Sequence, residues 1–181
     1  KYLHESIMKI IIATFLLIVS QSAFTEENSK RINLKYGANS GGFGFGPAVE
    51  YKASKNVTLG ALYETISSNS GTVSAISTGF GINARYYFTE ALTQDIYIHT
   101  SYVTGTSKVS NNVTSVKVDA SSINLTFGKT WMWDGFNLDS SIGVRSMSIG
   151  RIKTNSDVDT SSLENLDGFG LSGSFTIGYA F

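Results

Sequence analysis

One pair of side chains in the chain has the composition of a nucleophilic site. His99 and Ser101 are two residues apart, so a β-strand would place both on the same face. A serine hydroxyl becomes a good nucleophile when an imidazole removes its proton, and an acidic side chain usually orients that imidazole. The neighbouring segments supply no acid for this pair except Asp119. A hydrogen-bonded interior histidine is therefore the better interpretation, and acyl transfer or hydrolysis is the alternative.

A second set of residues brings charges of both signs to one face of the predicted strands. Unpaired buried charge is costly, so charges on an enclosed face must find partners. We expect the acids Glu50, Glu64 and Asp139 to pair with the bases Lys52, Arg85 and Arg145 and to occlude the interior. The full set is Lys35, Glu50, Lys52, Glu64, Arg85, Asp139 and Arg145.

These residues belong to eight segments in which apolar and aromatic side chains alternate with small, polar or charged ones. A period of two is typical of β-strands. The segments are residues 32–39, 43–52, 57–64, 76–88, 96–103, 122–131, 136–145 and 169–181. Sheet edges are absent from a closed barrel, and a lipid-facing barrel needs an apolar outer face. The sequence therefore predicts an all-β fold, an eight-stranded antiparallel up-and-down transmembrane β-barrel over residues 32–181.

The last segment shows this alternation most clearly. Phe175, Ile177, Tyr179 and Phe181 share one face, and only small or polar residues stand between them. The apolar face is long enough for a tilted strand to cross a bilayer. We expect this segment to close the barrel by pairing with residues 32–38.

Aromatic residues gather at the predicted strand ends, as they do at both interfaces of membrane barrels. Phe43, Tyr63, Tyr102 and Phe169 lie near one end. One girdle beside the short turns is expected to contain Tyr51, Tyr86, Phe88, Trp131, Trp133 and Phe136. A soluble ligand-binding barrel with its apolar face inside is the alternative, which strand alternation alone does not exclude.

The connections alternate in length, which is also typical of transmembrane barrels. Short turns are expected near residues 54, 91 and 133, and longer exposed loops at 67–74, 105–115 and 150–167. The last loop is acidic, but its spacing does not match a calcium-binding loop. We expect no metal site and no cofactor.

The beginning of the chain predicts an exported precursor. Residues 1–7 precede Met8, the expected translation start, and are interpreted as an upstream artefact. Residues 8–22 combine a basic residue, an apolar run and small residues, which predicts a signal peptide cleaved after Ser22 or Ala23. Residues 23–31 form a short polar lead-in. The chain has no cysteine, and its 14 basic residues balance 14 acidic ones. Disulfides are thus excluded, and nothing in the charge favours nucleic-acid binding.

Several motifs resemble one known family. They are residues 44–51 (Gly-Phe-Gly-Pro-Ala-Val-Glu-Tyr), 59–63, 85–88 and the terminal Gly-Tyr-Ala-Phe. Together they resemble the small bacterial outer-membrane β-barrel superfamily, which includes opacity-type, porin-family and OmpA-like barrel domains. The resemblance covers nearly all of residues 32–181 and implies a barrel-only member in the outer membrane of a Gram-negative cell. In such proteins the terminal residues Phe175, Ile177, Tyr179 and Phe181 would act as an assembly signal.

The resemblance sets the functional expectations. It implies a structural or surface-interaction role, with a narrow porin-like channel for ions or small solutes as the alternative. A lipid A or phospholipid acyl hydrolase using His99 and Ser101 is the third hypothesis. Expected partners are membrane lipids and lipopolysaccharide, the barrel-insertion machinery and periplasmic chaperones, and an extracellular ligand bound by the loops. We expect a monomer.

Overall fold

The computed structural model describes residues 32–155 and 168–181. The predicted upstream segment, signal peptide and lead-in, and the acidic residues of the last loop, lie outside the described residues. Over the described ranges, no helix has the length and apolar character needed to cross a membrane. The strands are β1 (Ile32–Ala38), β2 (Phe45–Lys52), β3 (Val57–Ser70), β4 (Val73–Tyr87), β5 (Asp95–Ser110), β6 (Ser115–Trp133), β7 (Phe136–Thr154) and β8 (Gly168–Ala180).

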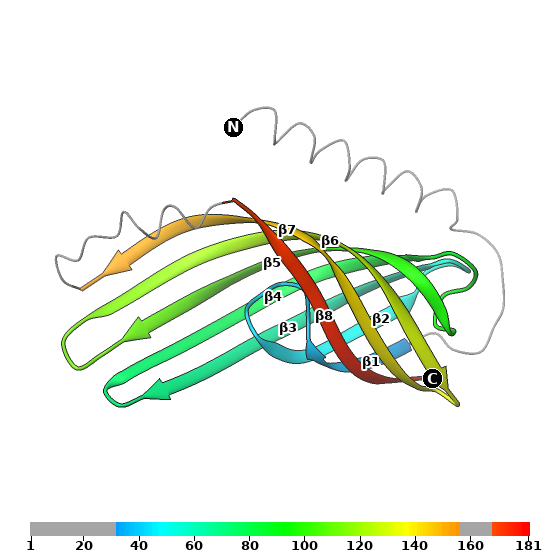
Figure 1. The fold of residues 1–181 in the computed structure, drawn as a ribbon, viewed down its shortest axis with the longest axis horizontal. Coiled ribbons are helices and arrows are strands. Elements are labelled where there is room, and N and C mark those ends of the chain that lie inside the picture. Colours follow the sequence, from blue (N-terminus) through cyan, green and yellow to red (C-terminus); the bar gives the residue numbers. More distant parts are fainter. Residues whose placement is uncertain (1–31, 156–167) are drawn as a thin grey trace.

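The eight strands form one closed barrel in sequence order (Figure 1). Each strand is antiparallel to its neighbours, and β8 returns to β1 with Lys35 opposite Gly178. Closure continues into the ends of the strands, where Phe181 and Ile32 exchange backbone hydrogen bonds of 2.9 and 3.1 Å. The predicted eight-stranded antiparallel barrel, closed by its last segment, is confirmed.

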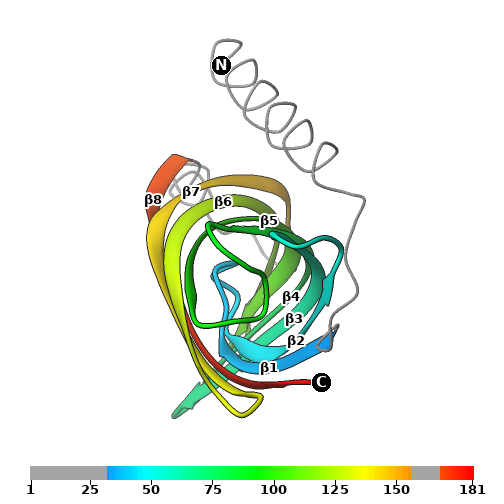
Figure 2. The ribbon, with the colours of Figure 1, turned by 90° about the vertical axis from the view of Figure 1, so that its right-hand side faces the viewer.

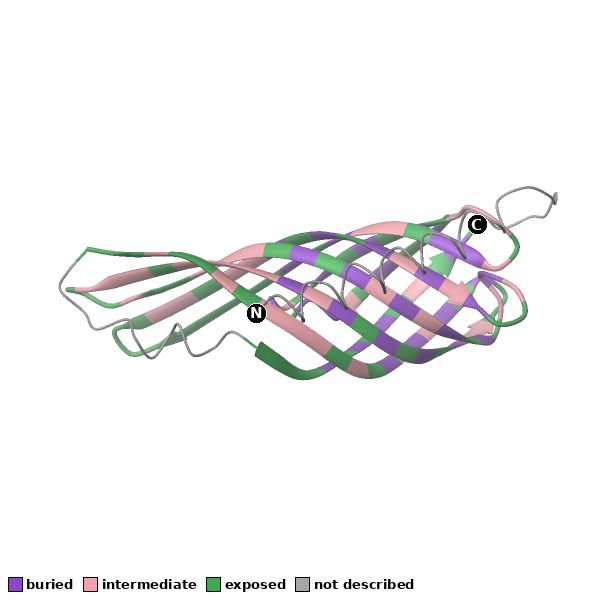
Figure 3. Ribbon diagram, turned by 90° about the horizontal axis from the view of Figure 1, so that it is seen from above, coloured by how far each residue is buried: buried purple, intermediate pink, exposed green. Residues whose placement is uncertain are grey.

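Burial alternates along the strands with a period of two (Figure 3). On β6, Asn124, Thr126 and Thr130 are buried, whereas Leu125 and Phe127 are exposed. On β8, Ser172, Ser174 and Thr176 are buried, whereas the aromatic residues between and beyond them are exposed. The polar face therefore lines the lumen and the apolar face lies outside. This is the opposite of a soluble barrel with an apolar interior.

The connections at the two barrel ends differ. At the short-turn end, the β6–β7 hairpin turns at Asp134 and Gly135, whose φ angles are 47° and 92°. Two positive φ angles define the type I′ turn, whose twist matches that of the flanking strands. At the other end, which we call the long-hairpin end, β3–β4 and β5–β6 continue as paired strands, with β7 alongside β6, past the ends of β1, β2 and β8 (Figure 1).

The long hairpins correct the predicted loops. Pairing extends to Ser70 opposite Val73 and to Ser110 opposite Ser115, so most of 67–74 and 105–115 is strand. Strand β7 also runs to Thr154, into the predicted loop 150–167. The prediction ended each strand where its apolar face ended. Backbone pairing needs no apolar side chains, and β6 and β7, at 19 residues each, exceed the roughly 9–11 that cross a bilayer.

Candidate functional site

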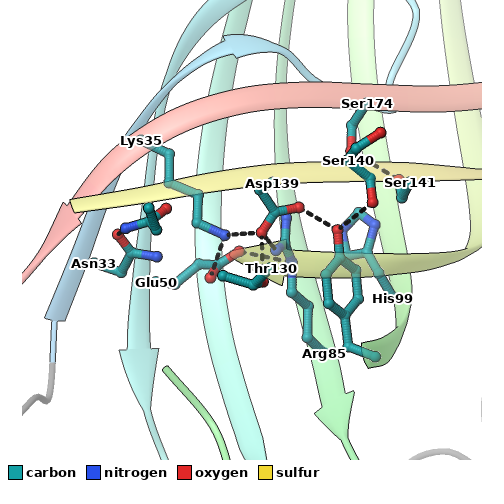
Figure 4. A network of polar contacts seen from close by, with 12 residues as sticks. Asn33, Lys35, Glu50, Arg85, His99, Thr130, Asp139, Ser140, Ser141 and Ser174 are labelled. Atoms are coloured by element: carbon teal, nitrogen blue, oxygen red, sulfur yellow. Dashed lines mark hydrogen bonds and ion pairs between the residues drawn. The ribbon is translucent and has the colours of Figure 1, made fainter. Parts of the chain in front are cut away.

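Four charged side chains meet inside the lumen, each from the third or fourth residue at the short-turn end of its strand (Figure 4). Lys35 on β1 lies 3.1 Å from Glu50 on β2 and 2.8 Å from Asp139 on β7. Arg85 on β4 lies 2.8 Å from Glu50 and 2.5 Å from Asp139. All four side chains are at most 4% exposed. Two cations therefore alternate with two carboxylates, and this charge ring is neutral.

Neutral donors complete the ring around Asp139. Thr130 on β6 donates a hydrogen bond of 3.0 Å to Oδ2, and the Tyr97 hydroxyl on β5 donates to Oδ1. The Arg85 guanidinium also lies over the Tyr97 ring, 4.4 Å from its centroid. The carboxylate of Asp139 on β7 thus binds side chains from four other strands, β1, β4, β5 and β6. These contacts connect opposite walls of the barrel.

The structure separates the other three predicted charges from this ring. Lys52 lies near the short-turn end, where its ammonium is 2.8 Å from Glu90. Arg145 is half-buried on β7 towards the long-hairpin end. There its guanidinium fills the space that a Cβ on Gly42 would occupy. Glu64 makes its hydrogen bonds with the backbone, and the predicted base Arg145 acts on it through electrostatic attraction.

Glu64 holds the segment between β1 and β2, which folds into the barrel (Figure 2). Its Oε1 accepts a 3.0 Å hydrogen bond from the N–H of Gly41, and its Oε2 accepts one of 2.9 Å from the N–H of Phe43. Serine hydroxyls hold the other side: Ser122 donates to the Gly41 carbonyl and Ser172 to the Ser40 carbonyl, both at 3.1 Å. We call residues 39–44 the inner loop.

Phe43 anchors the inner loop by burial. Its side chain is 3% exposed and packs with Ala48, Leu62 and Val103. Gly79 and Gly105 give the ring its space, because a Cβ at either position would lie 2.7 Å from a ring carbon. The prediction of Phe43 in an aromatic girdle is therefore wrong. The glycines on either side of Phe43 let the chain leave the strand and turn inward.

A second segment folds over the short-turn end of the lumen. Between β4 and β5 the chain crosses the mouth of the barrel, as Figure 2 shows in green. Ala91 and Leu92 are 1% and 2% exposed, and Leu92 has a φ of 60°, which is uncommon for a residue with a side chain. The Ala91 N–H donates to the Lys55 carbonyl at 2.6 Å. We call residues 88–94 the mouth loop.

His99 and Ser101 are both buried and point into the lumen. His99 Nδ1 lies 3.1 Å from Thr126 Oγ1, while Ser101 contacts Ser40 and Asn124 at 3.0 and 3.1 Å. Among the described residues, no hydrogen bond connects His99 with Ser101 and no carboxylate is bonded to the imidazole. The pair thus belongs to the packed interior and lacks the relay that activates a serine.

The outer face carries the predicted aromatic and assembly residues. Phe175, Ile177, Tyr179 and Phe181 are each about half exposed on β8 and just beyond it. Of the predicted girdle, Tyr51, Phe88, Trp133 and Phe136 are exposed, and Tyr86 and Trp131 are half-buried. The Lys129 ammonium lies 5.5 Å from the Trp131 ring. These groups form an apolar band edged by aromatic rings at the short-turn end.

Comparison with solved structures identifies the fold. A major outer membrane protein from Thermus thermophilus matches with a TM-score of 0.50 and 12% identity, over 85% of this chain and all of that chain. The fold is that of a small outer-membrane barrel. Acinetobacter baumannii CarO2 and CarO match the chain at TM-scores of 0.46 and 0.45, with 12% and 13% identity. They cover 85% and 83% of this chain, and 100% and 97% of their own. No protein-family model matches the sequence, and no curated protein is significantly similar to it.

Within this barrel, sequence reasoning missed the inner loop, the mouth loop and the part of Tyr97 in the charge ring. One signal for the inner loop was present. Residues 41–46 read Gly-Gly-Phe-Gly-Phe-Gly, and two glycines occur at inward positions of β4 and β5 beside Phe43. A large ring facing glycines on a polar face was the available clue. The mouth loop has no comparable signal.

Proposed function

We propose that the protein resides in the bacterial outer membrane, has a closed polar lumen, and acts through its surfaces rather than as a channel. The proposal covers a structural role in the membrane and contacts made by the long hairpins outside the cell. The fold places the polar face inside, and the apolar outer band supplies the surface that lipid chains would cover.

The inner loop is the observation that carries the closed lumen. It enters the barrel from the long-hairpin end and is held there by Glu64 and by the burial of Phe43. The charge ring crosses the lumen below it, and the mouth loop lies over the far end. Eight strands leave an interior just wide enough for side chains to fill. Three successive layers in so narrow a barrel favour a role without conduction.

Conductance in planar bilayers tests the closed lumen. The native protein should give no steady open state. A variant in which residues 40–43 are shortened to a two-residue Asn-Gly turn should show channel openings, because the shortening removes the inner loop from the lumen. Steady channels of one defined size in the native protein would contradict the proposal and favour the narrow porin-like channel.

Membrane location has a separate test. The folded barrel should migrate faster than the boiled protein on a detergent gel, and it should fractionate with the outer membrane. A heat-insensitive species in the periplasmic fraction would refute the proposed location, whatever the conductance.

The remaining expectations are part of the same proposal. Motif residues 44–51, 59–63 and 85–88 lie on or beside the adjacent strands β2, β3 and β4, which supports membership of the opacity-type and OmpA-like group. Assembly by the insertion machinery and chaperones, a monomeric state and an extracellular ligand follow from that membership. We assign no catalytic role to His99 and Ser101. A lipid A or phospholipid hydrolase activity that His99→Ala abolishes would contradict this.

A further inference from the structure

Three lysines lie side by side on neighbouring strands of the long hairpins. Lys108 on β5 is opposite Lys117 on β6, and Lys117 is opposite Lys153 on β7. Strands are about 4.8 Å apart, so the row spans about 10 Å. Like charges directly opposite each other destabilise a sheet. A row of three exposed ammonium groups is therefore unfavourable unless an anion lies against it.

The row is on the outer surface of the barrel. Tyr102 is exposed on the outer face and is paired with the half-buried Ile123, and Lys108 and Lys117 each lie six residues from this pair towards the long-hairpin end. An even number of residues keeps a side chain on the same face. The lysines thus point outward, towards the molecules that surround the barrel, and away from the lumen.

A β-bulge brings the third lysine into the row. The β6–β7 register shifts between Val118 and Ala120, so that Ile149 is opposite Ala120 but Ile152 is opposite Val118. One extra residue on β7 is accommodated there. Without it, Ile152 would be opposite Lys117 and Lys153 would face inward. Bulges commonly redirect a side chain at functional positions, and this one turns Lys153 outward beside Lys117.

The lysines line a shallow hollow of about 540 Å³ together with Thr78, Thr106 and Asn155. Among the described residues around this hollow, Asp119 is the acid: its Oδ1 is 4.0 Å from the Lys117 ammonium and accepts a 2.9 Å hydrogen bond from Thr106. Within residues 32–155 and 168–181, three bases and one acid at the hollow leave an excess of two positive charges. Ammonium and hydroxyl donors at this spacing are suited to phosphate oxygens.

From this geometry we infer that Lys108, Lys117 and Lys153 bind phosphate groups on the saccharide of an outer-leaflet glycolipid, the lipopolysaccharide. The inference rests on the proposed outer-membrane location. Six residues beyond Tyr102 correspond to about 20 Å along a strand, or about 15 Å along the barrel axis at the usual tilt. Headgroup regions of ordinary phospholipids add only about 5–8 Å to each side of the hydrocarbon core. Phosphates on a sugar chain extend further from the membrane and reach the lysine row.

Binding in detergent tests the inference directly. Refolded, glycolipid-free protein is titrated with fluorescently labelled lipopolysaccharide carrying a phosphorylated inner core, and anisotropy reports the Kd. The Lys108→Gln/Lys117→Gln/Lys153→Gln variant should bind roughly 100-fold more weakly, since each lysine near an anionic surface contributes about fivefold. The corresponding Lys→Arg triple variant, which keeps the charge, should bind within about threefold of the native protein.

Matched control variants distinguish binding at the lysine row from a general effect of the positive charge of the protein. Lys55→Gln/Lys129→Gln removes two lysines at the short-turn end, and its Kd should equal that of the native protein. Lys108→Gln/Lys153→Gln removes the same charge from the row and should weaken binding roughly 25-fold. Equal Kd values for these two variants would overturn the inference.

Two further outcomes would also overturn it. Equal affinity for enzymatically dephosphorylated lipopolysaccharide would exclude phosphate as the ligand, and competition by inorganic pyrophosphate as strong as by the whole glycolipid would indicate a free-phosphate site. If the triple variant were destabilised in glycolipid-free detergent, the lysines would serve a contact within the chain instead. Heat-modifiable migration and membrane fractionation of the native protein test the proposed location. Failure of the proposed location can therefore be distinguished from failure of the inference about phosphate binding.

Discussion

Two layers of the same lumen use carboxylates in different ways. In the charge ring, Glu50 and Asp139 each contact Lys35 and Arg85, so side chains of the wall bind other side chains of the wall. In the layer above, Glu64 binds two backbone N–H groups of the inner loop. The ring ties rigid strands together, whereas Glu64 and Phe43 hold a segment that could lie elsewhere. We therefore expect changes in the ring to affect stability and changes around the inner loop to affect conductance as well.

The largest expected effect is that of Asp139→Ala. Removing this carboxylate leaves two buried cations facing one acid, and breaking a buried pair in this way costs about 3–5 kcal/mol. Urea titration followed by tryptophan fluorescence should show that loss in the free energy of unfolding. The control is Asp139→Ala/Lys35→Met, which restores neutrality and should recover more than half of the loss. A loss below about 1 kcal/mol in the single variant would contradict a stabilising role for the ring.

Phe43→Ala should have the next largest effect. The buried ring fills space left by Gly79 and Gly105, and truncating a buried phenylalanine costs about 3 kcal/mol. The variant should also show channel openings in planar bilayers, because the inner loop loses its anchor. Phe45→Ala is the matched control, since that ring is 50% exposed on the outer face two residues away. If Phe45→Ala conducted as often as Phe43→Ala, the inner loop would not be what closes the lumen.

Glu64→Gln should cost less stability and still change conductance. The amide keeps one acceptor oxygen, so one of the two N–H groups loses its partner, at about 2 kcal/mol. Single-channel recordings should show brief openings that the native protein lacks. Glu50→Gln changes the charge ring instead of the contacts to the inner loop. This variant should lower stability but should give no channel openings in planar bilayers. Openings in Glu50→Gln and none in Glu64→Gln would reverse the roles assigned to the two layers.

Lys52→Ala should have the smallest effect. The Lys52–Glu90 pair lies at the short-turn end, with side chains 12% and 42% exposed. Pairs that water can reach contribute about 0.5 kcal/mol, and salt screens that contribution. Unfolding experiments at low and high salt should show the small difference shrink. A loss as large as that of Asp139→Ala would mean that this pair belongs functionally to the ring.

Sequence reasoning described the barrel wall correctly where side chains alternate between the outer face and the lumen. Asn124, Thr126 and Thr130 were placed inside, and Leu125 and Phe127 outside, and the structure agrees. The same reasoning failed beyond the apolar band, because Ser70 and Ser110 look like loop residues and are paired strand residues. It also failed for Phe43, whose aromatic ring matched the pattern of the outer face but is buried inside.

The sequence by itself determined the number of strands and which residues share a face of each strand, because a period of two is a local property of the chain. Only the tertiary structure decided that the polar face lines the lumen and which charges pair. Lys35 and Asp139 are 104 residues apart and meet because closure of the barrel sets the register of all eight strands at once. Closure also decided that Glu64 binds the backbone of the inner loop, and that a bulge turns Lys153 towards Lys117. Those contacts depend on distances across the ring, which no local pattern in the sequence encodes.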